Sequence, residues 1–193
     1  MEPAPDDRRA SWPKGVRALY WSDYVAHCSH KAPESRERRR LLALPRLLVN
    51  PSLQAVLVLR IANASPRWTW WIWRNFFVRL HSMDWSGKLE IGPGFEIPHP
   101  IGVLLAADAQ IGANVGLGHN VTLAGERGPG RPIIEDNVTV YPGSVLMGGV
   151  RIGEGSIVGA NCVVTRDVPP GRMVTPRGVV PLAASNRHGE PGT

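Results

Sequence analysis

Cysteine is scarce in this sequence, and long apolar runs are absent from it. The two cysteines, Cys28 and Cys162, lie far apart without a partner spacing, so we expect thiols in a reducing compartment. No uninterrupted apolar run approaches the roughly 18 residues that a transmembrane helix needs. The N-terminus, MEPAPDDRRA, has no apolar signal core. We therefore expect a cytoplasmic protein.

Acidic residues are fewer than basic ones. The 193-residue chain has 22 Lys and Arg against 16 Asp and Glu, which gives a formal charge of +6 and a pI near 10. Arginine supplies most of the excess. This charge is compatible with a solvated helix surface or with attraction for an anionic ligand or an acidic surface. No known nucleic-acid-binding motif is present, so the charge does not indicate DNA or RNA binding.

What the sequence does contain is a short repeat. An aliphatic residue returns every six positions through residues 89–169, and this period slips by two residues between Val103 and Ile111. A period of six fits neither an amphipathic helix nor an alternating strand, and it is typical of a stacked parallel β-helix. The residues at the aliphatic position are Ile91, Ile97, Val103, Ile111, Leu117, Leu123, Ile134, Val140, Leu146, Ile152, Val158 and Val164.

Each hexapeptide can supply one short strand and one corner, so three of them close a triangular coil. We expect the aliphatic side chains to point inward and to stack at roughly the 4.8 Å spacing of neighbouring strands. The Gly, Asn and Asp residues between them suit corners that need left-handed backbone angles or a small side chain. A chain of hairpins is the alternative, but it would alternate with a period of two. Cys162 takes an inward position, which predicts a buried thiol.

Residues 1–83 read as an α-helical region whose first 13 residues are mobile. Helical patterns cover residues 15–28, 35–44 and 53–64, the last with Asn50 as its cap and Pro51 at its first position. We expect Pro45 and Pro51 to break the apolar stretch between the second and third helices. The helices should cap the open end of the β-helix, residues 84–170, because that end exposes unpaired strand edges. Residues 171–193 form a C-terminal extension.

Residues 68–80, WTWWIWRNFFVRL, combine six aromatic residues with Arg74 and Arg79. The segment is too short to span a bilayer. Tryptophan and arginine are enriched at protein interfaces and at membrane surfaces. We favour packing across the end of the β-helix or against a neighbouring subunit, with contact to a membrane surface as the alternative.

Two features of the repeat region are candidates for a site. The loop at residues 124–132 is rich in Gly and Pro, so it cannot continue the coil and has to leave the scaffold. His99 lies at a corner between Pro98 and Pro100, which restrict the backbone around it. A lone surface histidine is the alternative interpretation.

With these features in place, the sequence resembles a known family. The run IGPGFEIPHPIGVLLAADAQIGANVGLGHNVTLAG, the loop and then RPIIEDNV are similar to the serine O-acetyltransferase branch of the hexapeptide-repeat acyltransferases. The resemblance covers about residues 84–170. It implies a mainly β protein, a left-handed parallel β-helix with an α-helical N-terminal cap. It also implies a homotrimer with active sites between subunits, and acetyl transfer from acetyl-CoA to a hydroxyl without a metal, as in cysteine biosynthesis.

The resemblance assigns the catalytic roles to His99 and Asp84. His99 matches the general base that takes the proton of the acceptor hydroxyl, and Asp84, 15 residues earlier, matches the aspartate that orients it. A carboxylate on one imidazole nitrogen fixes the tautomer that leaves the other nitrogen free as a base. A turn residue that caps the first coil is the alternative role for Asp84.

The acceptor pocket departs from the family pattern. Pro98 stands where serine-specific members have an aspartate for the substrate ammonium, and Gly130 and Arg131 stand where they have Arg-His, whose arginine binds the carboxylate. Arg131 can restore a carboxylate or phosphate contact only from a shifted position. His119 stands in place of a glutamine, either lining the pocket or as an exposed corner residue.

For the acyl donor, the resemblance predicts a coenzyme A groove between neighbouring β-helices. Backbone groups at Gly125, Pro142 and Ala160 match those that hold the donor, although proline has no N–H to offer. Arg166 and Arg172 are available for its phosphates, or are simply solvated.

Three functions stay open on the sequence. The first is serine O-acetyltransferase activity, and the second is acetylation of a sugar or a specialised metabolite, which the pocket changes favour. The third is a non-catalytic β-helix that acts in assembly, against which the presence of both Asp84 and His99 argues.

Overall fold

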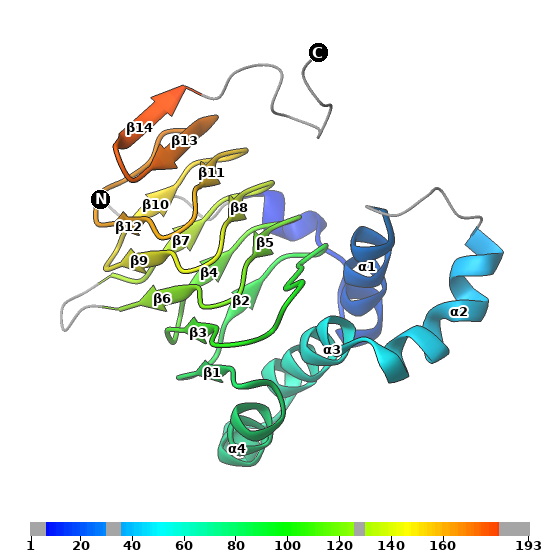
Figure 1. The fold of residues 1–193 in the computed structure, drawn as a ribbon. Helices are drawn as coiled ribbons and strands as arrows, with labels where there is room; N and C mark the ends of the chain where they lie inside the picture. Colours follow the sequence, from blue (N-terminus) through cyan, green and yellow to red (C-terminus); the bar gives the residue numbers. More distant parts are fainter. Residues whose placement is uncertain (1–6, 30–35, 126–129, 182–193) are drawn as a thin grey trace.

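The computed structural model describes residues 7–29, 36–125 and 130–181 as a helical region followed by a parallel β-helix (Figure 1). Within the stretch expected to be mobile, Asp7–Ser11 forms the 3-10 helix η1. The Arg9 side chain donates to the Gln110 side chain at 2.6 Å and pairs with Glu90. The start of the described chain is therefore attached to the β-helix, whereas residues 1–6 and 182–193 lie outside the described residues.

The sequence-predicted helices are present, and the start of the third is confirmed in detail. The Asn50 side chain accepts hydrogen bonds from the N–H groups of Ser52 and Leu53 at 2.9 and 3.4 Å, with Pro51 at the first helical position. The helical elements are α1 (Val16–Ser29), α2 (Arg36–Val49), α3 (Pro51–Ala64), η2 (Arg67–Thr69) and α4 (Trp70–His81).

The prediction that Pro45 ends the second helix is wrong, because α2 continues through this residue to Val49. A proline inside a helix removes one backbone hydrogen bond, here the one to the Leu41 carbonyl. Both Leu41 and Pro45 are exposed, so water can satisfy that carbonyl. The break falls at Asn50, where α2 and α3 meet at an angle of 96°.

The strands form three parallel sheets that make the faces of a triangular β-helix. Neighbouring coils pair in register, as in Leu105 with Leu123 and Ile134 with Ile152. The first sheet contains β1 (Asp84–Trp85), β3 (Leu104–Leu105), β6 (Thr122–Ala124), β9 (Val145–Met147) and β12 (Val163–Val164). The second contains β2 (Glu90–Ile91), β4 (Gln110–Ile111), β7 (Ile133–Ile134) and β10 (Arg151–Ile152). The third contains β5 (Gly116–Leu117), β8 (Thr139–Val140), β11 (Ile157–Val158), β13 (Arg172–Thr175) and the antiparallel β14 (Gly178–Pro181).

The core of the β-helix consists of the aliphatic residues that the period of six predicted, and all twelve are buried. Ile91 pairs with Ile111 across the two-residue slip, and Ile111 pairs with Ile134 across the loop. The two-residue slip and the loop therefore lie at corners of the β-helix. The aliphatic residues before and after each of them still point inward.

The corners use left-handed backbone angles, as predicted. Asn114 and Asn137 have φ values of 54° and 59°, and the Asn114 amide donates to the Asn137 side chain at 3.1 Å. Gly94 lies on the preceding coil with φ of 74°, and a Cβ there would lie 2.3 Å from the Asn114 side-chain oxygen. Asparagine tolerates these angles better than other residues with a Cβ, whereas at Gly94 no Cβ fits.

The helices cap the first coil of the β-helix through a shared core and a buried ion pair. Leu59 of α3 packs in the same cluster as Met83 and Trp85. Arg60 forms two hydrogen bonds of 2.9 Å with Asp23 of α1 and also donates to the carbonyls of Ile91 and Gly92. Burial raises the pKa of the Asp23 carboxyl, and the hydrogen bonds from Arg60 and from Phe95 N–H oppose this shift.

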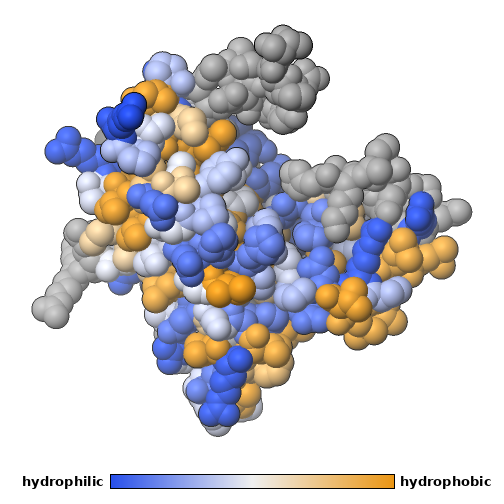
Figure 2. Space-filling view, viewed as in Figure 1, coloured by the Kyte–Doolittle hydropathy of each residue, from blue (hydrophilic) through white to orange (hydrophobic). Residues whose placement is uncertain are grey.

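The Trp-rich helix α4 lies against the first coil with one face and leaves other aromatic residues exposed. Trp70 and Trp73 pack against the core, whereas Trp71 and Phe76 are exposed. Figure 2 shows hydrophobic surface on α2 and around α4. Among the described residues no single helix is long and apolar enough to cross a membrane, and the bent pair of α2 and α3 meets that test only in length and composition.

Candidate active site

Four residues with predicted roles stack at one corner, where the chain passes from the third sheet to the first (Figure 1). The Gly143 N–H donates to the His119 carbonyl at 3.0 Å, and the Asn161 N–H donates to the Pro142 carbonyl at 2.9 Å. The rings of His99 and His119 meet edge to face with centroids 6.1 Å apart. We name this stack the histidine corner, and it consists of His99, His119, Pro142 and Ala160.

His99 is exposed on a backbone that the following turn holds in place. The Ile101 N–H donates to the His99 carbonyl at 2.8 Å, and the Gly102 N–H donates to the Ser82 carbonyl at 3.0 Å. Gly102 has φ of 67°, and a Cβ there would lie 2.0 Å from the Asn120 side-chain oxygen, so the turn requires glycine. The imidazole is therefore accessible on a fixed support, which suits a general base.

Asp84 begins β1, at the edge of the first sheet that borders the histidine corner. Its N–H donates to the Val103 carbonyl at 3.0 Å. Its carboxylate accepts two hydrogen bonds from Arg74, from Nε to Oδ1 at 2.6 Å and from Nη2 to Oδ2 at 2.5 Å. Among the described residues, the side-chain partner of Asp84 is thus Arg74 rather than His99, although both predicted catalytic residues border the same corner.

Arg74 is the residue of this region that sequence reasoning missed. The sequence places it in a segment expected to pack across the end of the β-helix or against a neighbouring subunit. No spacing rule links it to Asp84, because the chain turns between α4 and β1 at Ser82. That residue ends the helix with φ of 52°. The pair raises the pKa of the Arg74 guanidinium through its hydrogen bonds with Asp84.

A second group of predicted residues lies at a different corner, where the chain passes from the first sheet to the second. Arg131 donates from Nε to the Ala107 carbonyl at 3.1 Å and from Nη1 to the Gly130 carbonyl at 3.0 Å. A Cβ at Gly125 would lie 2.9 Å from the Arg131 side chain. Arg166 is exposed at the same corner. Within one chain, the first sheet therefore separates these residues from the histidine corner, and loop residues 126–129 lie outside the described part.

The last coil of the histidine corner fits a slender, amide-containing donor. Ala160 is exposed, and within the described part of the chain its N–H donates to no other group, so it can bind a carbonyl of a pantetheine chain. The neighbouring coil offers the exposed ring of Tyr141 and the N–H-free Pro142. Arg166, at the other corner, is exposed and carries a charge that suits a phosphate. Within one chain the histidine corner thus fits the pantetheine part of coenzyme A, and this cation lies on the other side of the first sheet.

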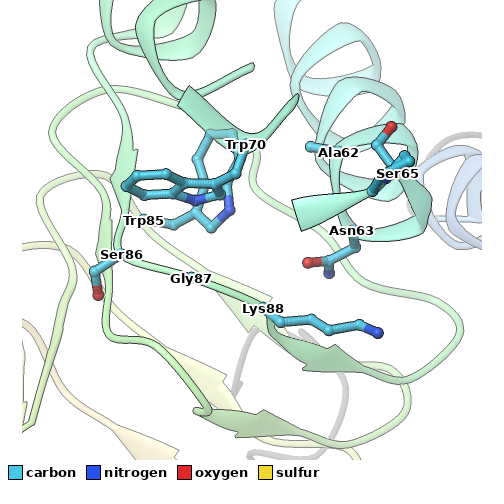
Figure 3. Close-up of a pocket in the computed structure, with 9 residues that line it drawn as sticks. Ala62, Asn63, Ser65, Trp70, Trp85, Ser86, Gly87 and Lys88 are labelled. Carbon is cyan, nitrogen blue, oxygen red and sulfur yellow. The ribbon is translucent and has the colours of Figure 1, made fainter. Parts of the chain in front are cut away.

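A separate pocket of about 250 Å³ lies between α3, α4 and the first coil (Figure 3). The rings of Trp70 and Trp85 form one side, and Asn63 and Lys88 lie across from them. None of the predicted site residues lines it. This pocket therefore belongs to the helix–coil junction and lies apart from the histidine corner.

Other groups that could supply chemistry are accounted for. Cys162 is buried as predicted, and burial raises the pKa of its thiol, so the thiol stays protonated at neutral pH. Among the described residues, no group of three His, Cys, Asp or Glu side chains is placed to hold a metal ion. The titratable groups that border this corner include the two histidines, Tyr141 and the pair of Asp84 with Arg74.

A parallel β-helix built from hexapeptides is the fold that hexapeptide-repeat proteins share. The family described as bacterial transferase hexapeptide (six repeats) matches residues 131–166. This match covers the regular coils that follow the loop.

The relatives narrow the class to one family. The serine acetyltransferases of Bacillus subtilis and Bacillus licheniformis are 34% and 37% identical over 151 residues, with 68% of this chain and 68% of each relative covered. The serine acetyltransferase of Neisseria gonorrhoeae, solved in complex with serine, matches with a TM-score of 0.71 at 26% identity, covering 83% of this chain and 66% of that one. The soybean enzyme complexed with serine gives 0.69 at 29% identity, covering 82% and 65%.

This chain belongs to the serine acetyltransferase family, a family of acyltransferases. It spans just under two thirds of the two solved chains described above, and 58% of the Entamoeba histolytica isoform 3 structure.

Proposed function

We propose that the protein is an acetyl-CoA-dependent O-acetyltransferase whose acceptor is serine or a similar small polar molecule. The observation that carries the proposal is the histidine corner, where the accessible imidazole of His99 stands on a fixed turn and meets the ring of His119. Membership of the serine acetyltransferase family, with two relatives solved in complex with serine, supports the choice of acceptor.

In the proposed reaction, His99 acts as a general base. It accepts the proton of the acceptor hydroxyl as that oxygen attacks the thioester carbonyl of acetyl-CoA. A C–O bond forms and the C–S bond breaks, and the imidazolium returns the proton to the leaving thiolate, so that the side chain is regenerated. A positioned base of this kind contributes about 10²- to 10⁴-fold to the rate. Asp84 orients the imidazole, and Ala160 and Arg166 contribute to holding the donor.

We propose that the active unit is a homotrimer with its active sites between subunits. The corner with Gly125, Arg131 and Arg166 and the histidine corner border opposite edges of the first sheet, so they can meet only across two chains. The outward residues of that sheet support this arrangement, since they include the exposed Leu104 and Val163. The outward residues of the second sheet are Glu90, Gln110, Ile133 and Arg151.

Release of free thiol from acetyl-CoA, with L-serine as the varied acceptor, tests the proposal. We expect saturable release by the wild type and at least a tenfold lower turnover in His99→Ala, because the variant lacks the base. The variant should still bind coenzyme A, which checks that it is folded. Equal turnover in both proteins would refute the role of His99.

A sugar or specialised metabolite is the second candidate acceptor, and the state of Arg131 favours it. Its Nε and Nη1 donate to the backbone carbonyls of Ala107 and Gly130, so an acceptor carboxylate has to compete with these bonds or use the remaining N–H groups. Release of free thiol from acetyl-CoA with a sugar as acceptor, but not with L-serine, would show that the acceptor is of this second kind.

We place the reaction in the cytoplasm. The thiols of Cys28 and Cys162 are both buried and free, as suits a reducing compartment.

A further inference from the structure

Arg74 is held in one position from two sides. Its Nε and Nη2 form parallel hydrogen bonds with the two oxygens of Asp84, and its guanidinium carbon lies 5.5 Å from the centre of the Trp70 ring. Trp70 in turn packs against the core of the β-helix. A two-point contact of this kind fixes the plane of a carboxylate as well as its position.

We propose that Arg74 is a positioning residue that acts through Asp84 on His99. The inference rests on the proposed function, because it assumes that His99 is the base. Arg74 takes one lone pair on each oxygen of the Asp84 carboxylate, which leaves others for the N–H of an imidazole. The Asp84 side chain is 33% exposed, so these remaining sites are accessible.

The backbone brings the turn that carries His99 to the same place. Gly102 N–H bonds to the carbonyl of Ser82, two residues before Asp84. Ser82, Asp84 and Arg74 line one open hollow of about 370 Å³. In the proposed arrangement, rotation of the His99 side chain towards Asp84 completes a chain of contacts from Arg74 through Asp84 to the base.

Arg74 also sets the charge that the base experiences. A lone Asp84 carboxylate would stabilise the imidazolium strongly, whereas the pair of Asp84 with Arg74 carries no net charge. The electrostatic environment of the base therefore depends on Arg74 as well as on Asp84. The other ionisable ring that contacts this part of the corner is His119.

The pH dependence of kcat/KM tests this inference, because a purely structural role would not move it. In Arg74→Gln we expect about a tenfold loss of kcat and a shift of the acid limb to higher pH, since the carboxylate is no longer neutralised. In Asp84→Asn the limb should shift to lower pH, since the positive charge remains. Arg74→Lys keeps the charge but loses the two-point contact, so it should retain the pH profile while kcat still falls.

Arg79→Gln is the matched control, because Arg79 is an exposed arginine of the same helix; it should keep the wild-type values. In a His119→Gln background, Arg74→Gln should shift the acid limb of kcat/KM by the same amount. This result would show that the shift does not arise from the His119 ring. An Arg74→Gln profile that coincides with that of Arg79→Gln would overturn the inference.

An NMR titration of the His99 ring tests this inference without any measurement of activity, and so separates it from the proposed function. The midpoint should move in opposite directions in Arg74→Gln and Asp84→Asn. If the wild type fails to acetylate serine but the midpoints move as expected, the acceptor is wrong and Arg74 keeps its role. If the midpoints do not move, the inference fails whatever the activity.

Discussion

Among single residues, His81 is expected to make the folding stability of the protein depend on pH, because its side chain is buried. It lies in the last turn of α4 with 4% of its surface exposed, and burial lowers its pKa. In the unfolded chain a histidine titrates near pH 6.5. Below that pH the unfolded state therefore binds a proton that the folded state resists, and stability falls as the pH falls from about 6.5 towards the lower folded pKa.

We predict that His81→Gln removes part of this acid sensitivity. Between about pH 7 and about pH 5, the free energy of unfolding should decrease less in the variant than in the wild type. Urea denaturation at several pH values measures this slope, and an overall loss of stability in the variant would not affect the comparison. His119→Gln, at a partly exposed ring, should keep the wild-type slope. Equal slopes in all three proteins would contradict the assignment to His81.

The inward residues were predictable one by one, whereas the contacts of the site were not. A period of six determines which side chains stack, so the burial of Leu117 or Ile152 follows from position alone. The pairing of Arg74 with Asp84 depends on where α4 ends and how it meets β1. That geometry is a tertiary property, and no local spacing encodes it.

Among the elements, the junction of α1, α3 and the first coil depends on the buried pair of Asp23 and Arg60, which are 2% and 4% exposed. We predict that Arg60→Met destabilises the protein by about 3–5 kcal/mol, because it leaves a buried carboxylate without its partner. Urea denaturation at a fixed protein concentration measures the change.

Two further variants make this prediction specific. Arg60→Met combined with Asp23→Leu should recover part of the loss, since no buried charge then remains. Arg17→Met, at an exposed arginine of α1, should stay within about 0.5 kcal/mol of the wild type. A similarly small effect in Arg60→Met would show that the pair does not hold the junction.

Helix ends were predictable where the sequence carries a capping signal. Asn50 with Pro51 marks the start of α3. Pro45 predicts a break, but α2 continues through it because the carbonyl that loses its hydrogen bond lies at the exposed Leu41. The strands are only two to four residues long, which is too short for strand propensity to predict them. The six-residue period predicted their positions instead. The buried ion pair across 37 residues had no signal in the sequence.

For the whole molecule, the main prediction concerns assembly. Val163 lies on the outward face of β12 with 64% of its surface exposed. We predict that Val163→Glu dissociates the proposed trimer and abolishes turnover, because it places charges at the contact between first sheets. Sedimentation equilibrium measures the oligomeric state alongside the thiol-release assay.

Val179→Glu is the matched control, because Val179 is an exposed valine of β14, on the third sheet. It should remain trimeric and active. A Val163→Glu variant that stays trimeric would place the subunit contact elsewhere.

The central claim is that an acetyl group passes to a serine-type hydroxyl at the histidine corner, and product analysis tests it most directly. Wild-type protein, acetyl-CoA and L-serine are incubated, and NMR identifies any ester and the oxygen that carries it. The account predicts an acetyl ester on the serine hydroxyl, formed saturably by the wild type and at least tenfold more slowly by His99→Ala. No ester on serine, or an ester that forms equally fast without His99, would contradict it.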